Sequence, residues 1–217
     1  ENQTSDDACI LNYEDKRLRE FAKTVKSRVL FFSSEHELSE GAFLHNDKII
    51  IRIDGNEQVL CRIYDMNLLG KHNYENVMAA SLMALSLGIS ISSIKKSIQT
   101  FKAVEHRIEF VAEVDGVTYY NDSKGTNPDA AVQAIKAMNR PTILIAGGYD
   151  KHIEFDDWVK ECIGRARHMV IIGECRQQIA DTCDKYGFTS YTLADTFEEA
   201  FKLAKKTARS GEAVLLS

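Results

Sequence analysis

Asn121-Asp122-Ser123-Lys124-Gly125-Thr126-Asn127-Pro128-Asp129 is the stretch from which the fold of this chain is best inferred. Residues 117–120, directly before it, are β-branched or aromatic and indicate a strand. After it, apolar side chains recur at helical spacing, at Ala131, Ala134, Ile135 and Met138. The stretch is therefore predicted to be a loop between a strand and a helix, as in α/β folds.

A loop of this kind favours the binding of an anion. Unpaired amide groups at a helix N-terminus, the helix dipole and Lys124 would together attract a phosphate or carboxylate, and Ser123 or Thr126 could add a hydroxyl. The alternative is a polar turn in which Asn127 caps the helix and Pro128 occupies its first position. Capping explains those two residues but leaves the aspartate, the lysine and the hydroxyls of the loop unexplained.

Composition limits the class of protein. The chain has 217 residues, enough for one large domain or two small ones, and a hydrophobic content of 44% is ordinary for a globular protein. A formal net charge of −5 argues against a general nucleic-acid binder. No apolar run approaches the roughly 20 residues that cross a bilayer, and the first residues are polar and acidic, unlike a signal peptide. We therefore expect a cytoplasmic protein with no membrane partner that acts on small molecules.

The five cysteines form no C-x-x-C pair, and their number is odd. This pattern indicates reduced thiols and argues against a zinc site. We therefore assign no metal ligand in this sequence.

Two parts of the chain differ in pattern, with a boundary near residues 102–105. The first part, residues 1–103, is predicted to contain strands at 8–12, 28–32, 41–45, 48–53 and 58–63, and helices near 18–25, 74–88 and 92–101. Turn residues at 46–47 and 54–56 make the last three strands a β-meander. The first part is therefore α/β in character.

The second part, residues 104–217, begins with a hairpin over 108–121. Strands are then predicted at 142–146, 169–172, 190–193 and 213–216, alternating with helices near 155–166, 176–186 and 197–208. This alternation predicts a mostly parallel sheet with right-handed crossovers, so that the domain is Rossmann-like. Ligands of such a domain bind beyond the carboxyl ends of the strands.

Gly147-Gly148-Tyr149-Asp150-Lys151 follows one of these strands. Paired glycines would let the backbone approach a ligand, and Lys151 would place a cation beside the loop that contains Lys124. The alternative is a plain turn at the end of a strand, and the sequence alone favours it.

Three further residue pairs invite a functional interpretation. Asn73 and Asn76 lie three apart at the start of a helix, so both amides could face a purine, although Asn73 could instead be a cap. Arg107 could bind a triphosphate, or form a surface salt bridge. His106 beside it is more often a packing or hydrogen-bonding residue than a catalyst. Gly70-Lys71 is not a P-loop, because the Gly-x-x-x-x-Gly-Lys-Ser/Thr pattern is absent.

Four blocks occur in order along most of the chain: Gly70-Lys71-His72-Asn73-Tyr74-Glu75-Asn76, His106-Arg107-Ile108-Glu109-Phe110, residues 121–128 and Gly147-Gly148-Tyr149-Asp150-Lys151. On these residues the chain resembles the Mur ligase family. Residues 122–128 are similar to the branch that adds glutamate, because the sister ligases carry different residues at this loop.

The resemblance implies an ATP-dependent amide ligase of peptidoglycan synthesis that adds D-glutamate to UDP-N-acetylmuramoyl-L-alanine through an acyl phosphate. ATP and Mg²⁺ are the implied cofactors, with magnesium ligands mostly outside these residues. In the family fold, residues 1–103 would be the later part of a central ATP-binding α/β domain, and residues 104–217 most of a C-terminal Rossmann-like domain that binds the amino acid. A monomeric enzyme of the bacterial cytoplasm is expected.

The resemblance also implies roles for individual residues. Catalytic roles fall on Lys124 and His106. Contacts with the nucleotide fall on Asn73, Asn76, Arg107 and Asp122. Contacts with D-glutamate fall on Thr126, Lys151, Lys124 and Ser123.

Relative to the family pattern, we expect the chain to lack an upstream UDP-binding domain with its P-loop and magnesium-organising residues, and a segment beyond Ser217. Residues 1–217 alone are then expected to show no ligase turnover. One alternative is a non-catalytic module that binds a nucleotide or an amino acid. Another is a related ligase, such as a different Mur ligase or a folylpolyglutamate ligase, although residues 122–128 argue against it.

Overall fold

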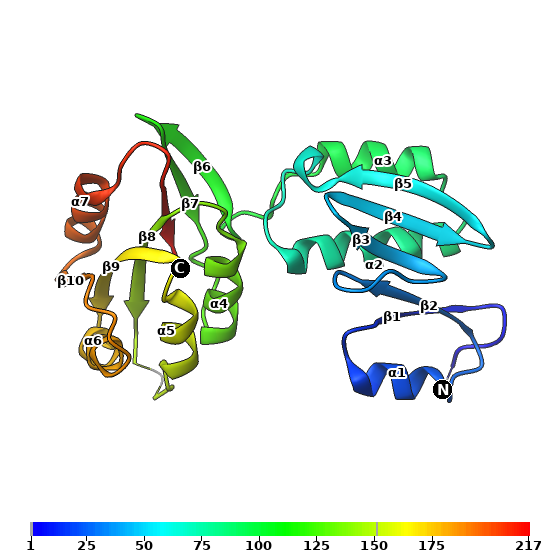
Figure 1. Cartoon of the computed structure of the whole chain (residues 1–217), viewed down its shortest axis with the longest axis horizontal. Coiled ribbons are helices and arrows are strands. Elements are labelled where there is room, and N and C mark those ends of the chain that lie inside the picture. Colours follow the sequence, from blue (N-terminus) through cyan, green and yellow to red (C-terminus); the bar gives the residue numbers. More distant parts are fainter. Residues whose placement is uncertain (1, 151) are drawn as a thin grey trace. The chain divides into compact units, whose positions relative to one another are not determined.

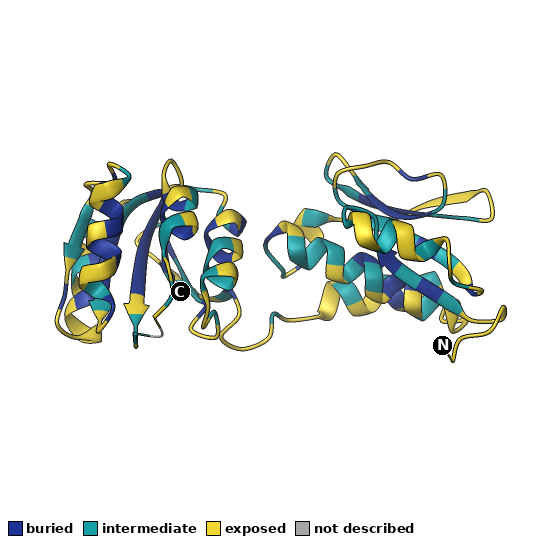
Figure 2. Ribbon diagram, turned by 90° about the horizontal axis from the view of Figure 1, so that it is seen from below, coloured by how far each residue is buried: buried dark blue, intermediate teal, exposed yellow. Residues whose placement is uncertain are grey.

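The computed structural model describes residues 2–150 and 152–217. It divides into two compact units, Glu1–Lys102 (unit 1) and Ala103–Ser217 (unit 2). Each unit is an α/β structure with its own sheet, which can be followed in Figure 1. Figure 2 shows that in each unit the central strands are largely buried and the outer faces of the helices are exposed.

Unit 1 contains a five-stranded sheet in the order β1-β2-β3-β4-β5. The strands are β1 (Ala8–Asn12), β2 (Arg28–Ser33), β3 (Gly41–His45), β4 (Lys48–Ile53) and β5 (Asn56–Arg62). The first three are parallel, and β3, β4 and β5 are antiparallel neighbours. The β-meander predicted from the turn residues is therefore confirmed, with φ of 55° at Asn46 and 75° at Gly55.

The helices of unit 1 are α1 (Lys16–Ala22), α2 (Lys71–Ser86) and α3 (Ile91–Thr100), with a 3₁₀ turn at Ile63–Asp65. Met78 and Leu82 of α2 and Ile94 of α3 pack on Ile49 and Ile51 of β4. The apolar stripe on α2 thus fixes this helix against one face of the sheet.

Unit 2 contains a six-stranded sheet in the order β10-β9-β8-β11-β7-β6. The strands are β6 (Glu109–Val114), β7 (Val117–Asn121), β8 (Thr142–Gly148), β9 (Ala166–Gly173), β10 (Tyr191–Leu193) and β11 (Ala213–Leu216). All neighbours are parallel except β6 and β7, which form the predicted hairpin. The predicted mostly parallel α/β sheet is therefore confirmed.

Helices cover both faces of this sheet. They are α4 (Pro128–Ala137), α5 (Asp156–Cys162), α6 (Arg176–Lys185) and α7 (Phe197–Thr207). Ala200 and Ala204 of α7 pack with Ile143 and Ile145 on one face. On the other face Cys183 of α6 contacts the sulfur of Met169 at 3.9 Å. Two apolar faces on one sheet explain why its central strands read as continuous hydrophobic runs.

One predicted helix is shorter than expected. The helix placed near 155–166 ends at Cys162, and the strand placed at 169–172 begins at Ala166. Gly164, at φ 82°, turns the chain between them. The additional strand residues are held by parallel pairing with β8, where Ala166 lies opposite Thr142. Long-range pairing of this kind leaves no local pattern in the sequence.

The side chain of Asn127 caps α4, accepting the N–H of Ala130 at 2.8 Å, and Pro128 follows at the first helical position. Asn127→Ala should lower the free energy of unfolding by about 1 kcal/mol, because a helix N–H loses its acceptor. Urea unfolding monitored by circular dichroism measures this change. Asn127→Asp keeps a cap acceptor and should unfold at nearly the parent's midpoint; equal losses in both variants would contradict the capping role.

Candidate functional site

The two predicted loops lie at one edge of the unit 2 sheet. Strand β11 runs parallel to both β7 and β8, and Leu216 lies opposite Asn121 on one side while Ser217 donates to Ile145 on the other. The carboxyl ends of β7 and β8 therefore point to the same edge, from which the loops after Asn121 and after Gly148 both start. This is the position expected for ligand-binding loops in a parallel sheet.

The loop after β7 is held by its own backbone. The N–H of Ser123 donates to Oδ1 of Asn121 at 3.0 Å, and the N–H of Gly125 donates to the carbonyl of Asp122 at 2.7 Å. The N–H of Thr126 donates to the carbonyl of Lys124 at 3.0 Å. The side chains of Ser123, Lys124 and Thr126 are exposed. A fixed backbone with an exposed cation and exposed hydroxyls can bind a carboxylate or a phosphate.

Asp122 is the buried member of this loop, with 6% of its surface exposed. Its Oδ1 accepts the N–H of Ile108 at 2.9 Å, and its Oδ2 accepts the hydroxyl of Ser217 at 3.2 Å. These contacts join the start of β6, the loop after β7 and the end of β11.

His106 lies beside the loop as a hydrogen-bonding residue. Its Nδ1 is 2.9 Å from Nδ2 of Asn121, and its carbonyl accepts the N–H of Lys124 at 3.1 Å. Because Oδ1 of Asn121 already accepts the N–H of Ser123, the amide presents its N–H to the ring, and Nδ1 of His106 acts as the acceptor. The neutral ring then carries its proton on Nε2. A catalytic role for His106 stays a prediction.

Arg107 follows directly and is exposed, while its backbone N–H donates to the carbonyl of Val104 at 3.0 Å. The structure thus brings His106, Arg107 and the loop residues 121–127 together within unit 2. Lys151 lies outside the described residues, and its predicted contact with D-glutamate stays a prediction.

Gly147 has a structural explanation. A Cβ atom at this position would lie 1.9 Å from the carbonyl oxygen of Ile172, so the close approach of β8 to β9 requires glycine. Gly148 differs, because a Cβ there would meet nothing within 4 Å. The backbone approach expected from the paired glycines is therefore, at Gly147, an approach to the neighbouring strand.

In unit 1, Asn73 and Asn76 lie in the first turns of α2. Gly70, at φ 94°, is the residue that caps this helix, so the alternative in which Asn73 is the cap is wrong. Nδ2 of Asn73 donates to the carbonyl of Leu69 at 2.7 Å. Asn76 is exposed one turn later.

Three residues near this helix have ligand-type atoms close together, namely Glu14, Glu35 and His36, all within 4.8 Å of one another. Oε1 of Glu14 accepts the hydroxyl of Ser33 at 2.6 Å, while Oε2 is buried without a hydrogen bond. The ion pair with Lys71 holds the pKa of Glu35 below its usual range. Mg²⁺ prefers oxygen ligands, and this set offers a histidine and an acid already paired with a lysine. The set does not fit magnesium.

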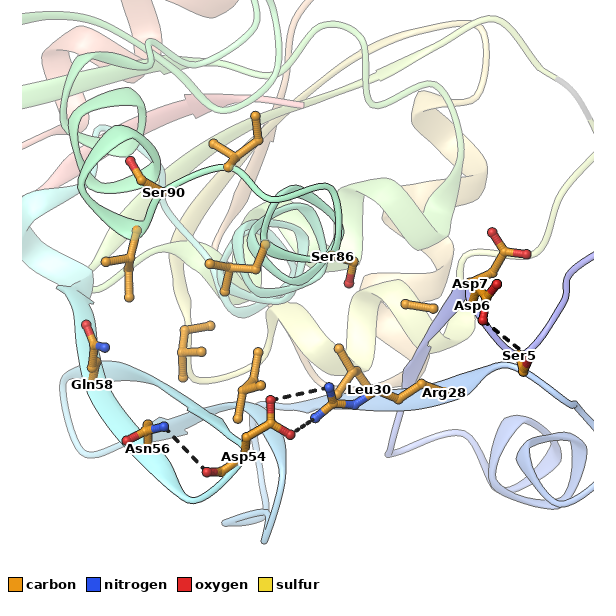
Figure 3. Close-up of a pocket in the computed structure, with 16 residues that line it drawn as sticks. Ser5, Asp6, Asp7, Arg28, Leu30, Asp54, Asn56, Gln58, Ser86 and Ser90 are labelled. Carbon is orange, nitrogen blue, oxygen red and sulfur yellow. Dashed lines mark hydrogen bonds and ion pairs between the residues drawn. The ribbon is translucent and has the colours of Figure 1, made fainter.

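A pocket of about 590 Å³ lies in unit 1, near the residues where β1 and β2 begin. It is lined by residues that precede or begin β1 and β2, such as Asp7 and Arg28, and by the end of α2 at Ser86. Figure 3 shows Arg28 bonded to Asp54 here, at 2.6 Å. Neither Asn73 nor Asn76 is among the residues that line this pocket.

Several residues of the candidate site had no role in the sequence interpretation. Oε2 of Glu109 accepts the N–H of His106 at 2.9 Å. Asn121 forms a hydrogen bond with the ring of His106, and Ser217 donates one to Asp122. Glu109 and Asn121 stand inside recognised blocks, so their position was a usable signal. Ser217 lies 95 residues from Asp122, and no local pattern connects the two.

Cations and hydroxyls at the carboxyl edge of a parallel α/β sheet are typical of domains that bind anionic ligands. Residues 106–217, more than half of the chain, match the sequence profile described as "Mur ligase, glutamate ligase domain". The chain therefore belongs to the Mur ligase family.

Curated relatives narrow this family. The chain is 52% identical over 217 residues to the UDP-N-acetylmuramoylalanine–D-glutamate ligase of Lachnospira eligens, and 46% identical over 216 residues to the ligase of the same name from Lachnoclostridium phytofermentans. Both matches cover 100% of this chain and 48% of the relative. The chain thus spans about half the length of the curated relatives that it matches.

Solved structures share the fold. MurF from Acinetobacter baumannii superposes with a TM-score of 0.68 at 20% identity, over 96% of this chain and 48% of that one. Folylpolyglutamate synthase from Thermotoga maritima gives 0.59 at 18% identity, over 92% and 48%. No helix in the described parts of the chain has the length and apolar character needed to span a bilayer.

Proposed function

We propose that the gene product is an ATP-dependent ligase that joins D-glutamate to UDP-N-acetylmuramoyl-L-alanine in peptidoglycan synthesis, acting as a monomer in the bacterial cytoplasm. The observation that carries this proposal is the Asp-Ser-Lys-Gly-Thr-Asn-Pro loop at the carboxyl end of β7, within a Mur ligase domain. The names of the relatives at 52% and 46% identity support D-glutamate as the amino acid.

Unit 2 would bind the amino acid. Lys124, Ser123 and Thr126 are exposed residues on a loop that leads into the N-terminus of α4. A lysine ammonium, hydroxyl donors and a helix N-terminus all favour a carboxylate. In this proposal Lys124, Thr126, Ser123 and Lys151 hold the carboxylates of D-glutamate and keep its amine oriented for attack.

For the nucleotide, each unit by itself offers candidate binding residues. Asn73 uses Nδ2 for the carbonyl of Leu69, so Oδ1 is the atom that it can offer to an amino group of a purine. Asn76 is exposed on the next turn, and Arg107 is exposed beside the loop after β7. A guanidinium suits bidentate binding of phosphate.

These residue types fit ATP, which when bound supplies the phosphoryl group that activates a carboxylate. Arg107 and Lys124 would stabilise negative charge that develops near the loop, an effect that is often the largest single contribution to catalysis. The Nε2 proton that hydrogen bonding assigns to His106 would be available as a donor at the same place. Magnesium accompanies ATP in such chemistry, and we assign it no ligand among the described residues.

The test is formation of ADP and product by the full gene product with UDP-N-acetylmuramoyl-L-alanine, ATP and one amino acid at a time. ADP should form only when D-glutamate is present, and L-glutamate, L-lysine, meso-diaminopimelate and D-alanyl-D-alanine should each give less than about 1% of that rate. L-lysine and D-alanyl-D-alanine leave one carboxylate-binding group unpaired, and the two carboxylates of meso-diaminopimelate are farther apart than those of glutamate. L-glutamate has the opposite configuration and cannot place both carboxylates and its amine in the same positions. Turnover with another amino acid would indicate a sister ligase. A folded protein that binds ATP or D-glutamate without turnover would indicate a binding module.

A further inference from the structure

The Asp122 side chain lies where three segments of unit 2 meet. It receives the backbone N–H of Ile108 at 2.9 Å and the hydroxyl of Ser217 at 3.2 Å. Its own backbone N–H donates to the carbonyl of Leu216 at 2.7 Å. With 6% of its surface exposed, Asp122 is placed to organise these segments.

The segment of residues 106–108, whose Ile108 N–H donates to Asp122, has an unfavourable backbone conformation. His106 has φ of 66° and Ile108 has φ of 45°. The left-handed region is costly for a β-branched residue such as isoleucine, and it persists only where surrounding contacts hold it. Arg107 lies between these two residues, so the direction in which its guanidinium leaves the chain depends on this turn.

Besides the N–H of Arg107, which donates to the carbonyl of Val104 at 3.0 Å, three backbone groups of the turn form hydrogen bonds. The N–H of Ile108 donates to Asp122, the N–H of His106 donates to Oε2 of Glu109 at 2.9 Å, and the carbonyl of His106 accepts the N–H of Lys124 at 3.1 Å. The first is the one that involves a buried carboxylate. Both bonds to carboxylates are stronger than a neutral bond, and burial of Asp122 further strengthens the bond that it accepts. The Ile108 bond is therefore the one expected to contribute most.

We propose that Asp122 is a positioning residue that acts through Arg107: its carboxylate holds the turn at residues 106–108 and so fixes where Arg107 presents its guanidinium. The proposal rests on the proposed function, in which Arg107 binds a nucleotide phosphate. It gives Asp122 a structural task in place of the direct nucleotide contact that the family resemblance implies.

One experiment tests this proposal without measuring ligase activity. Amide hydrogen exchange of Ile108, measured by NMR or mass spectrometry in the full gene product, should become at least about tenfold faster in Asp122→Ala, because the amide loses its buried acceptor. Strand amides of β8 should keep their protection and so report that unit 2 is folded. Unchanged protection of Ile108 would overturn the proposal.

The second experiment is a double-mutant cycle on kcat/KM for ATP. Asp122→Ala should lower this parameter about tenfold in the parent, but less than about twofold when Arg107→Ala is already present, because interacting residues are not additive. Additive losses would mean that Asp122 acts independently of Arg107, and would reject the proposal. Asp129→Asn, an exposed acid in the first turn of α4, is the matched control and should change the parameter little.

Asp122→Asn separates geometry from charge. The carboxamide still offers an oxygen to the N–H of Ile108, so Ile108 should stay protected and kcat/KM for ATP should remain within about threefold of the parent. Loss of activity with intact Ile108 protection would assign Asp122 a role through its charge, against the proposal. If the parent shows no ligation at all, the proposed function fails, while the exchange measurement still decides whether Asp122 holds the turn.

Discussion

Lys124→Ala is expected to lower kcat/KM for D-glutamate in the ligation assay by about two to three orders of magnitude, since it removes a fixed cation from the charge that develops in the reaction. The backbone of Lys124 is anchored, because its N–H donates to the carbonyl of His106 at 3.1 Å, while its side chain is exposed. The cation is thus presented from a rigid position.

Stability should change little in this variant. Exposed side chains away from special features contribute within about 0.5 kcal/mol, so the melting temperature should stay close to that of the parent. Lys206→Ala, an exposed lysine in the last turn of α7, is the matched control and should retain parent activity. A threefold or smaller loss in Lys124→Ala, or an equal loss in the control, would remove Lys124 from the site.

The second large effect is expected on stability. Arg167→Met should lower the free energy of unfolding at pH 7 by about 3 kcal/mol, because it leaves the buried Glu212 carboxylate without its cation. Nη2 of Arg167 donates to Oε2 of Glu212 at 2.8 Å and to the carbonyl of Thr207 at 2.6 Å. Nε lies 2.6 Å from Oε1 without the alignment of a hydrogen bond. The side chain of Glu212 is only 10% exposed, so its carboxylate has little contact with water.

The pH dependence follows from the same contacts. Burial opposes ionisation of Glu212, but the hydrogen bonds from Arg167 and from the N–H of Arg209, together with the guanidinium charge, outweigh it and lower the pKa of the carboxyl. A carboxyl with a lower pKa in the folded state stabilises the parent above its unfolded pKa, and this stabilisation is lost as pH falls through the folded value. In Arg167→Met the Glu212 carboxylate is buried without the guanidinium that stabilises its charge. Protonation of this carboxyl at low pH removes the buried charge and so stabilises the folded variant. The difference in free energy of unfolding between variant and parent should therefore shrink as the pH falls from 7 toward about 4, which is near the ordinary pKa of a glutamate.

Urea unfolding of both proteins across this pH range measures the difference. Arg165→Met is a matched control, because Arg165 pairs with Glu161 at 3.3 Å where both side chains are substantially exposed, and such pairs contribute about 0 to 1 kcal/mol. A loss in Arg167→Met no larger than in the control, or one that grows on acidification, would contradict the role of the buried pair.

Local features of the site could be predicted from the sequence. Asn127 and Pro128 carry a capping pattern that needs only adjacent residues, and the strand before Asn121 shows its β-branched and aromatic composition. The loop and its position at the sheet edge followed from these signals. The turn at Asn46 and the β-meander around it were accessible for the same reason.

Contacts between distant segments could not be predicted. The position of β11 between β7 and β8 depends on pairing across about a hundred residues, and so does the bond between Ser217 and Asp122. The early end of α5 at Cys162 is another case, because pairing of β9 with β8 overrides the helical pattern around Gly164. The sequence alone favoured a plain turn at Gly147, but this residue lies within β8 and pairs with Ile172, and the carbonyl of Ile172 leaves no room for a Cβ atom.

The order of strands in unit 2 has a consequence for synthesis on the ribosome. Strand β11, residues Ala213–Leu216, lies in the middle of the sheet although it follows the other described strands of this sheet in the sequence. Until it emerges from the exit tunnel, the β6–β7 hairpin and the β8–β9–β10 group have no strand to join them, and each exposes an open edge. Unit 2 must therefore complete its fold late, and nascent chains that stall before residue 213 are the species on which a chaperone would act.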